Sequence, residues 1–122
     1  MRYLMVIWAD RDRANQWQMA NAEQQDVEAV PLHDWYETHS AAERIRSGAE
    51  AAWPRDAIVV RASSSGPVVE YGGDADDSVL SGVMVIEVDS VETATDMART
   101  WPDLRAPGDR IDLIPIRDYD QP

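Results

Sequence analysis

The two histidines are the side chains of this sequence best suited to acid–base chemistry. A neutral imidazole with a pKa of about 6.5 can accept and return a proton near neutral pH. His33 stands at the start of a helical pattern, in Pro31-Leu32-His33-Asp34, and Glu37 follows four residues later. On a helix, Glu37 shares a face with His33 whereas Asp34 points away. If His33 has a carboxylate partner, we therefore expect Glu37 or an Asp from a loop.

Each histidine also has a structural interpretation. His33 has polar neighbours, which favours a position on the outer, solvent-facing side of the helix. His39 lies within the apolar stripe, one turn after Trp35 and Tyr36, so it either lines a pocket or is a core residue bonded to a backbone carbonyl. Because residues six apart do not share a helix face, we expect no metal site from this pair.

Aromatic and arginine side chains are the other candidates for contact with a ligand. The candidate substrate-binding residues are Trp8, Trp35, Tyr36, Arg61 and Tyr71. The tryptophans, together with Trp53, could surround a flat apolar molecule, although filling the core is the alternative for each. The tyrosines and the arginine could orient a substrate or stabilise an oxyanion.

The composition excludes several classes of function. With 23 acidic and 11 basic residues the net charge is -12, which repels phosphate backbones and anionic membranes. All basic residues are arginine, so Schiff-base lysines and lysine phosphate loops are excluded. The lack of cysteine excludes disulfides and thiolate zinc sites. We expect a cytoplasmic protein without a cofactor, nucleic acid or membrane as partner.

The acidic segment Asp74-Ala75-Asp76-Asp77-Ser78 begins like a calcium-binding loop. The sixth position of that loop should be glycine and the twelfth a bidentate carboxylate, but this sequence has Val79 and Val85 there. We therefore predict a solvated loop.

The elements that position the histidines can be predicted from hydrophobic periodicity. Residues 2–8, RYLMVIW, are apolar on both alternating faces and predict a central strand. Residues 10–30 are polar and predict a loop with one or two short helical turns that ends at Pro31. From Leu32 an apolar stripe at helical spacing predicts the first long helix, with Gly48 as its C-terminal signal.

The second half of the chain predicts a hairpin, a strand, a helix and a final strand. Residues 57–62 and 67–71 are strand-like and flank the turn Ser63-Ser64-Ser65-Gly66. Residues 82–88 predict a buried strand, followed by a helix capped by Asp89 or Ser90. The apolar stripe of this helix is formed by Val91, Ala94, Met97, Ala98 and Trp101. Residues 111–116 predict a last strand, and Pro115 indicates that it lies near an edge or a bulge.

Together these elements predict one α+β domain over residues 1–122, in the order β-α-β-β-α-β with an extra segment before the first helix. Strands 2–8 and 82–88 are apolar on both faces, so helices on one side leave an apolar face to be covered. A partner subunit is the most economical cover. Two such sheets packed face to face would form a dimeric barrel, with a ligand cavity inside it or between sheet and helices.

The sequence resembles the YCII-related proteins, and among them the branch named for a DGPF motif. The resemblance rests on RYLMVIW, on the passage around residues 45–61, and on LSGVMVIEVDSVETATDMARTWP, residues 80–102. It implies a dimeric ferredoxin-like α+β barrel. In some members a histidine near the start of the first helix acts with an acidic residue as an acid–base pair, which here implies His33. At the place of the DGPF tetrapeptide this chain has Tyr71-Gly72-Gly73-Asp74.

Two functions are consistent with these residues. The first is a cofactor-free lyase, isomerase or cyclase that acts on a small, partly apolar substrate, in which His33 or His39 moves a proton. The second is a non-catalytic ligand-binding or accessory module, which the missing tetrapeptide favours. In both cases the predicted assembly is a homodimer.

Overall fold

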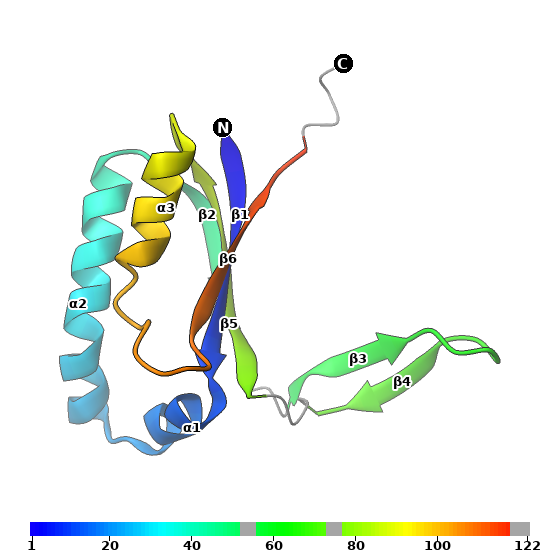
Figure 1. Ribbon diagram of the computed structural model, residues 1–122. Helices are drawn as coiled ribbons and strands as arrows, with labels where there is room; N and C mark the ends of the chain where they lie inside the picture. Colours follow the sequence, from blue (N-terminus) through cyan, green and yellow to red (C-terminus); the bar gives the residue numbers. More distant parts are fainter. Residues whose placement is uncertain (52–55, 73–76, 118–122) are drawn as a thin grey trace.

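An antiparallel sheet covered on one face by helices forms the body of the protein (Figure 1). The computed structural model describes residues 1–51, 56–72 and 77–117. Within these residues the elements are β1 (Arg2–Asp10), α1 (Arg11–Met19), α2 (Ala22–Ala41), β2 (Ile45–Glu50), β3 (Ile58–Arg61), β4 (Val68–Tyr71), β5 (Ser78–Glu87), α3 (Val91–Arg99) and β6 (Arg110–Pro115). The predicted α+β class is confirmed.

The main sheet has the strand order β2-β5-β1-β6, and all of its neighbouring strands are antiparallel. The two central strands, β1 and β5, are those that the sequence predicts as buried, and Met5 pairs with Met84 in their register. Strand β6 pairs with β1 at one edge of the sheet, and its last residue is Pro115. The edge position predicted from this proline is confirmed, because proline lacks the N–H that a central strand requires.

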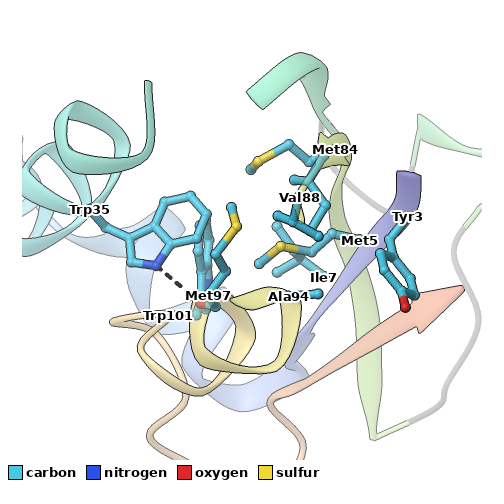
Figure 2. Packing of buried hydrophobic residues seen from close by; sticks show 10 residues of the cluster. Tyr3, Met5, Ile7, Trp35, Met84, Val88, Ala94, Met97 and Trp101 are labelled. Carbon is cyan, nitrogen blue, oxygen red and sulfur yellow. Dashed lines mark hydrogen bonds between the residues drawn. The ribbon is translucent and has the colours of Figure 1, made fainter. Parts of the chain in front are cut away.

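The core lies between the sheet and helices α2 and α3. Met5, Ile86 and Met97 are fully buried in it, and Figure 2 shows Met97 and Trp101 beside Trp35. Helix α3 is capped by Ser90, whose hydroxyl accepts a hydrogen bond from the Thr93 N–H at 3.1 Å. The predicted helix and its cap are therefore confirmed.

The predicted loop over residues 10–30 is wrong, because this segment forms α1 and the first half of α2. Helix α2 begins with a capping box. The Asn21 side chain accepts from the Gln24 N–H at 2.8 Å, and the Gln24 side chain accepts from the Asn21 N–H at 3.1 Å. With its start fixed there, the helix continues through Pro31, which we predicted as the end of the preceding segment.

The predicted end of the long helix at Gly48 is also wrong. Helix α2 ends seven residues earlier, at Ala41, and Glu43 adopts the left-handed conformation with φ 59°. The Glu43 and Arg44 N–H groups each donate to carbonyls of the last turn at 3.0 Å, which is a Schellman motif. Ile45 and Gly48 consequently lie in β2, an edge strand of the main sheet that the sequence analysis missed.

The predicted hairpin is confirmed as β3 and β4, with Gly66 at φ 111° in the turn. We call residues 58–71 the arm. The arm forms a separate two-stranded sheet, and Figure 1 shows it projecting from the lower end of the main sheet, on the side away from the helices.

The second face of the main sheet, which we call the open face, is apolar at its centre. Alternation and register place Leu4 and Val6 of β1 there, beside Val85 and Val83 of β5. At its periphery Ile114 is 49% exposed. In the described part of the chain, the helices lie on the opposite face (Figure 1).

Candidate functional site

A cleft of about 710 Å³ lies between the sheet and helices α1 and α2. Its volume is in the range of small-molecule sites. Apolar side chains from both layers line it, among them Ile7 and Met84 from the sheet and Trp17, Leu32 and Trp101 from the other side. Polar side chains reach the same cleft, namely those of Arg13, Glu28, His33, Tyr36, Glu50, Asp103 and Arg105.

His33 lines this cleft and its side chain is exposed. His33 thus faces solvent, as its polar neighbours suggested, and also lines the cleft. Within the described residues the imidazole makes no hydrogen bond or ion pair, and Glu37, the predicted partner, does not line the cleft. A carboxylate that orients the imidazole is thus absent from this part of the structure.

Tyr36 is the second candidate residue in the cleft, one turn after His33. Its ring packs edge-on against Trp35 at 5.4 Å and against Trp101 at 5.8 Å between ring centroids. Burial, and then the negative charges of Glu50 and Asp103, raise the pKa of the Tyr36 hydroxyl above its ordinary value. The hydroxyl therefore keeps its proton at neutral pH and can donate a hydrogen bond into the cleft.

Both arginines that line the cleft form ion pairs with carboxylates of this chain. The Arg105 guanidinium contacts Asp103 at 2.7 Å, and the Arg13 guanidinium contacts Asp109. In contrast, the cleft carboxylates Glu28 and Glu50 form no ion pair within the described residues. The uncompensated charge of the cleft is consequently negative.

Asp109 fixes the end of the cleft at which α1 begins. Its side chain is 1% exposed and accepts from the Arg13 Nε at 2.9 Å, the Asp10 N–H at 2.7 Å and the Ala106 N–H at 2.9 Å. Although burial raises the pKa of this carboxyl, the hydrogen bonds from Arg13 and from the backbone lower it further, to about 2. Sequence analysis missed this residue because its partners lie up to 99 positions away.

His39 lies in the core and not in the cleft. Its side chain is 8% exposed, and its ring packs on Trp35 with centroids 4.5 Å apart. The Arg44 guanidinium donates to Nδ1 at 3.0 Å, which takes the place of the backbone carbonyl that the sequence suggested and puts the ring proton on Nε2. Burial, and then the charge of Arg44, lower the pKa of His39, so the imidazole is neutral.

The tryptophans predicted to share one cavity lie apart. Trp35 is buried in the core, where its Nε1 donates to the Met97 carbonyl at 3.1 Å (Figure 2). Trp8 lies on the open face, where its Nε1 donates to Asp112 at 2.9 Å and Arg110 stacks over its ring at 5.0 Å. Trp53 lies outside the described residues. Trp35 is a buried indole whose N–H is bonded, and Trp8 is a partly buried one whose N–H is bonded, so packing accounts for both described positions.

The two remaining candidates lie on the arm, which Figure 1 shows on the side of the main sheet away from helices α1 and α2. Arg61 is ion-paired with Glu70 at 3.0 Å, and Tyr71 is 81% exposed. The structure therefore brings together His33 and Tyr36, and it adds Glu28 and Glu50, which the sequence analysis did not select.

Comparison of the sequence with protein-family models and with curated proteins finds no match. The resemblance to YCII-related proteins therefore stays a prediction. In residues 1–51, 56–72 and 77–117 no helix is long and apolar enough to cross a membrane. The same residues contain no group of three or more His, Cys, Asp or Glu side chains that could hold a metal ion.

Proposed function

We propose that the protein binds a small, partly apolar molecule with a positive charge in the cleft between α1, α2 and the sheet. One observation carries the proposal: both arginines of the cleft are paired, whereas Glu28 and Glu50 are not. An ammonium or guanidinium group would complement these carboxylates. The aromatic lining, which includes Trp17 and Tyr36, suits the apolar part of the ligand and attracts cations through the ring faces.

A second function, an acid–base enzyme without a cofactor, is supported by His33 and Tyr36, which line the same cleft one helical turn apart. In such a reaction His33 takes a proton from a C–H or O–H group of the substrate and returns it to another atom of the product. The protonated Tyr36 hydroxyl donates a hydrogen bond to the oxyanion that develops. We rank ligand binding first, because His33 has no carboxylate to orient it within the described residues.

The proposed architecture is a ferredoxin-like β-α-β-β-α-β domain that forms a homodimeric barrel. In support, β1, β2, β5 and β6 stand in the sheet order that this topology requires, and the arm is then an insertion between its second and third strands. The open face supports the dimer, because Leu4, Val83 and Val85 are partly exposed on it and Ile114 is exposed, and contiguous exposed apolar residues mark contact surfaces. A YCII-related origin and a cytoplasmic location belong to the same proposal.

Binding of matched probes tests the ligand class. Benzylamine, benzyl alcohol and benzoate share a ring and differ in charge, so calorimetry with the three separates charge recognition from apolar burial. We expect benzylamine to bind most tightly, and Glu50→Gln to weaken it by about tenfold, which corresponds to roughly 1.4 kcal/mol. Glu92→Gln, at an exposed carboxylate of α3 outside the cleft, is the control. Equal affinity for all three probes would contradict the proposal.

A further inference from the structure

The arm exposes an apolar face to water. In its register Ile58 lies opposite Tyr71 and Val60 lies opposite Val69, so these four side chains share one face. Their exposed fractions are 64%, 81%, 62% and 51%, respectively. On the other face Arg61 and Glu70 form an ion pair at 3.0 Å. Val59 and Val68 also lie on that second face, so it is more polar than the first but not fully polar. No layer of the described chain covers the apolar face formed by Ile58, Val60, Val69 and Tyr71.

A two-stranded hairpin of this kind is marginally stable at best when it stands alone in water, because its apolar face has nothing to pack on. The two strands of the arm pack on each other, and in the described residues neither has an extensive contact with another element. Figure 1 shows the arm extending away from the main sheet. Its stability thus requires a surface that a single copy does not supply.

The arm and the open face lie on the same side of the main sheet, away from the helices (Figure 1). Within the described residues, the charged side chains that strand alternation and pairing place on the open face are Arg2, Arg46, Arg110, Glu87 and Asp112. These three arginines and two carboxylates leave the described part of the open face close to neutral, whereas the whole chain carries -12. A second copy can therefore approach through this side without the repulsion that the rest of the surface would cause. A nucleic acid or an anionic membrane would need a strongly basic surface instead.

We propose that each arm packs its apolar face, formed by Ile58, Val60, Val69 and Tyr71, on a second copy of the chain. This inference rests on the homodimer proposed above, in which the open faces pack together. The arm then reaches beyond the sheet interface and holds the partner subunit. It is an interaction element of the dimer and not part of the ligand-binding cleft.

Two adjacent valines provide a matched test. Val69 lies on the apolar face of the arm and Val68, beside Arg61 in the register, lies on the opposite face. Val69→Lys and Val68→Lys add the same charge at neighbouring positions outside the core. By sedimentation equilibrium we expect Val69→Lys to raise the dimer dissociation constant at least about tenfold above that of Val68→Lys, because it places a charge in an apolar contact. Far-UV circular dichroism of both variants shows that the fold is retained.

The possible outcomes distinguish failure of the proposed arm contact from failure of the proposed dimer. If the wild type is a monomer at micromolar concentration, both the dimer and the arm contact are wrong. If Val85→Lys on the open face abolishes a wild-type dimer while Val69→Lys and Val68→Lys behave alike, the dimer stands and the arm contact is wrong. Hydrogen exchange provides a second readout: we expect amides of residues 58–71 to gain protection as the dimer fraction rises. Protection independent of protein concentration would overturn the inference.

Discussion

Asp109 and Arg13 form a bidentate ion pair. The Arg13 Nε donates to Oδ2 of Asp109 at 2.9 Å, and the Arg13 Nη2 donates to Oδ1 at 2.5 Å. The pair joins the start of α1 to the segment that precedes β6, two segments 96 positions apart in the sequence. Because the carboxylate is 1% exposed, its removal leaves a partly buried guanidinium without its counter-charge. We expect Asp109→Asn to lower the free energy of unfolding by about 3 kcal/mol at pH 7. Urea denaturation measures this, with Asp96→Asn, in an exposed pair with Arg99, as the control.

The same variant should show how the pair depends on pH. The folded-state pKa of Asp109, about 2, lies below the ordinary value of 3.8, so its contribution is complete above about pH 4 and is lost as the pH falls towards 2. The shift corresponds to about 2 kcal/mol. The difference in stability between wild type and Asp109→Asn should therefore shrink over this range. A difference that stays constant down to pH 2 would contradict the assignment.

His39 gives a second, separate dependence on pH. Its pKa is lowered below 6.5, so the unfolded chain binds a proton before the folded one does. The stability contributed by the neutral imidazole is complete above about pH 6.5 and decreases as the pH falls through the folded-state pKa. We expect the unfolding free energy of His39→Gln to vary less than that of the wild type between pH 7.5 and 5. Equal slopes for the two proteins would show that His39 is not the responsible group.

The two histidines should also differ in their effect on stability at neutral pH. His33 is exposed, so His33→Ala should change the unfolding free energy by less than about 0.5 kcal/mol. His39→Ala opens a cavity beside Trp35 and removes the acceptor of Arg44, and should cost about 2 kcal/mol. Thermal melting of His33→Ala and of His39→Ala measures these two effects on stability. A large loss for His33→Ala would show that its role is structural.

Glu43 offers a stabilising substitution. Its φ of 59° lies in the left-handed region, where a side chain is unfavourable and glycine is not. We expect Glu43→Gly to raise the unfolding free energy by about 1 kcal/mol. Ala42→Gly is the matched control, because Ala42 has φ -84° and gains nothing from glycine, so this variant should be destabilised. If both variants lose stability, the left-handed turn does not carry the expected strain.

The sequence predicts those parts of the fold that depend on local pattern. The central strands β1 and β5, helix α3 with its Ser90 cap, and the turn of the arm all follow from periodicity and from turn chemistry within a few residues. Strand β2 was missed because five of its six residues are exposed and give no alternation. The start of α2 was detectable, since Asn21 and Gln24 have capping-box spacing. Its end was not, because a glutamate in place of glycine gives no stop signal.

The candidate site was predictable to a similar degree. His33 and Tyr36 belong to a predicted helix, so their presence on neighbouring turns follows from the sequence. That both face a cleft depends on how α2 lies against the sheet, which periodicity does not give. Glu50 faces the cleft because it lies in the missed strand β2. The contact between Asp109 and Arg13 spans 96 positions and has no local signal at all.

Arg44 also determines how the cleft can move. Its side chain bonds the end of α2 through His39, while its carbonyl accepts the Glu87 N–H at 2.8 Å and begins the pairing of β2 with β5. Helix α2 and the sheet, which form the two walls of the cleft, are thus joined at Arg44. The buried side chains of α2, Trp35 and His39, both lie in its C-terminal half, so transient opening costs least near Asn21. We expect the distance between α2 and the sheet to fluctuate most near Asn21. Near Arg44, where α2 and β2 are joined, we expect this distance to stay constant.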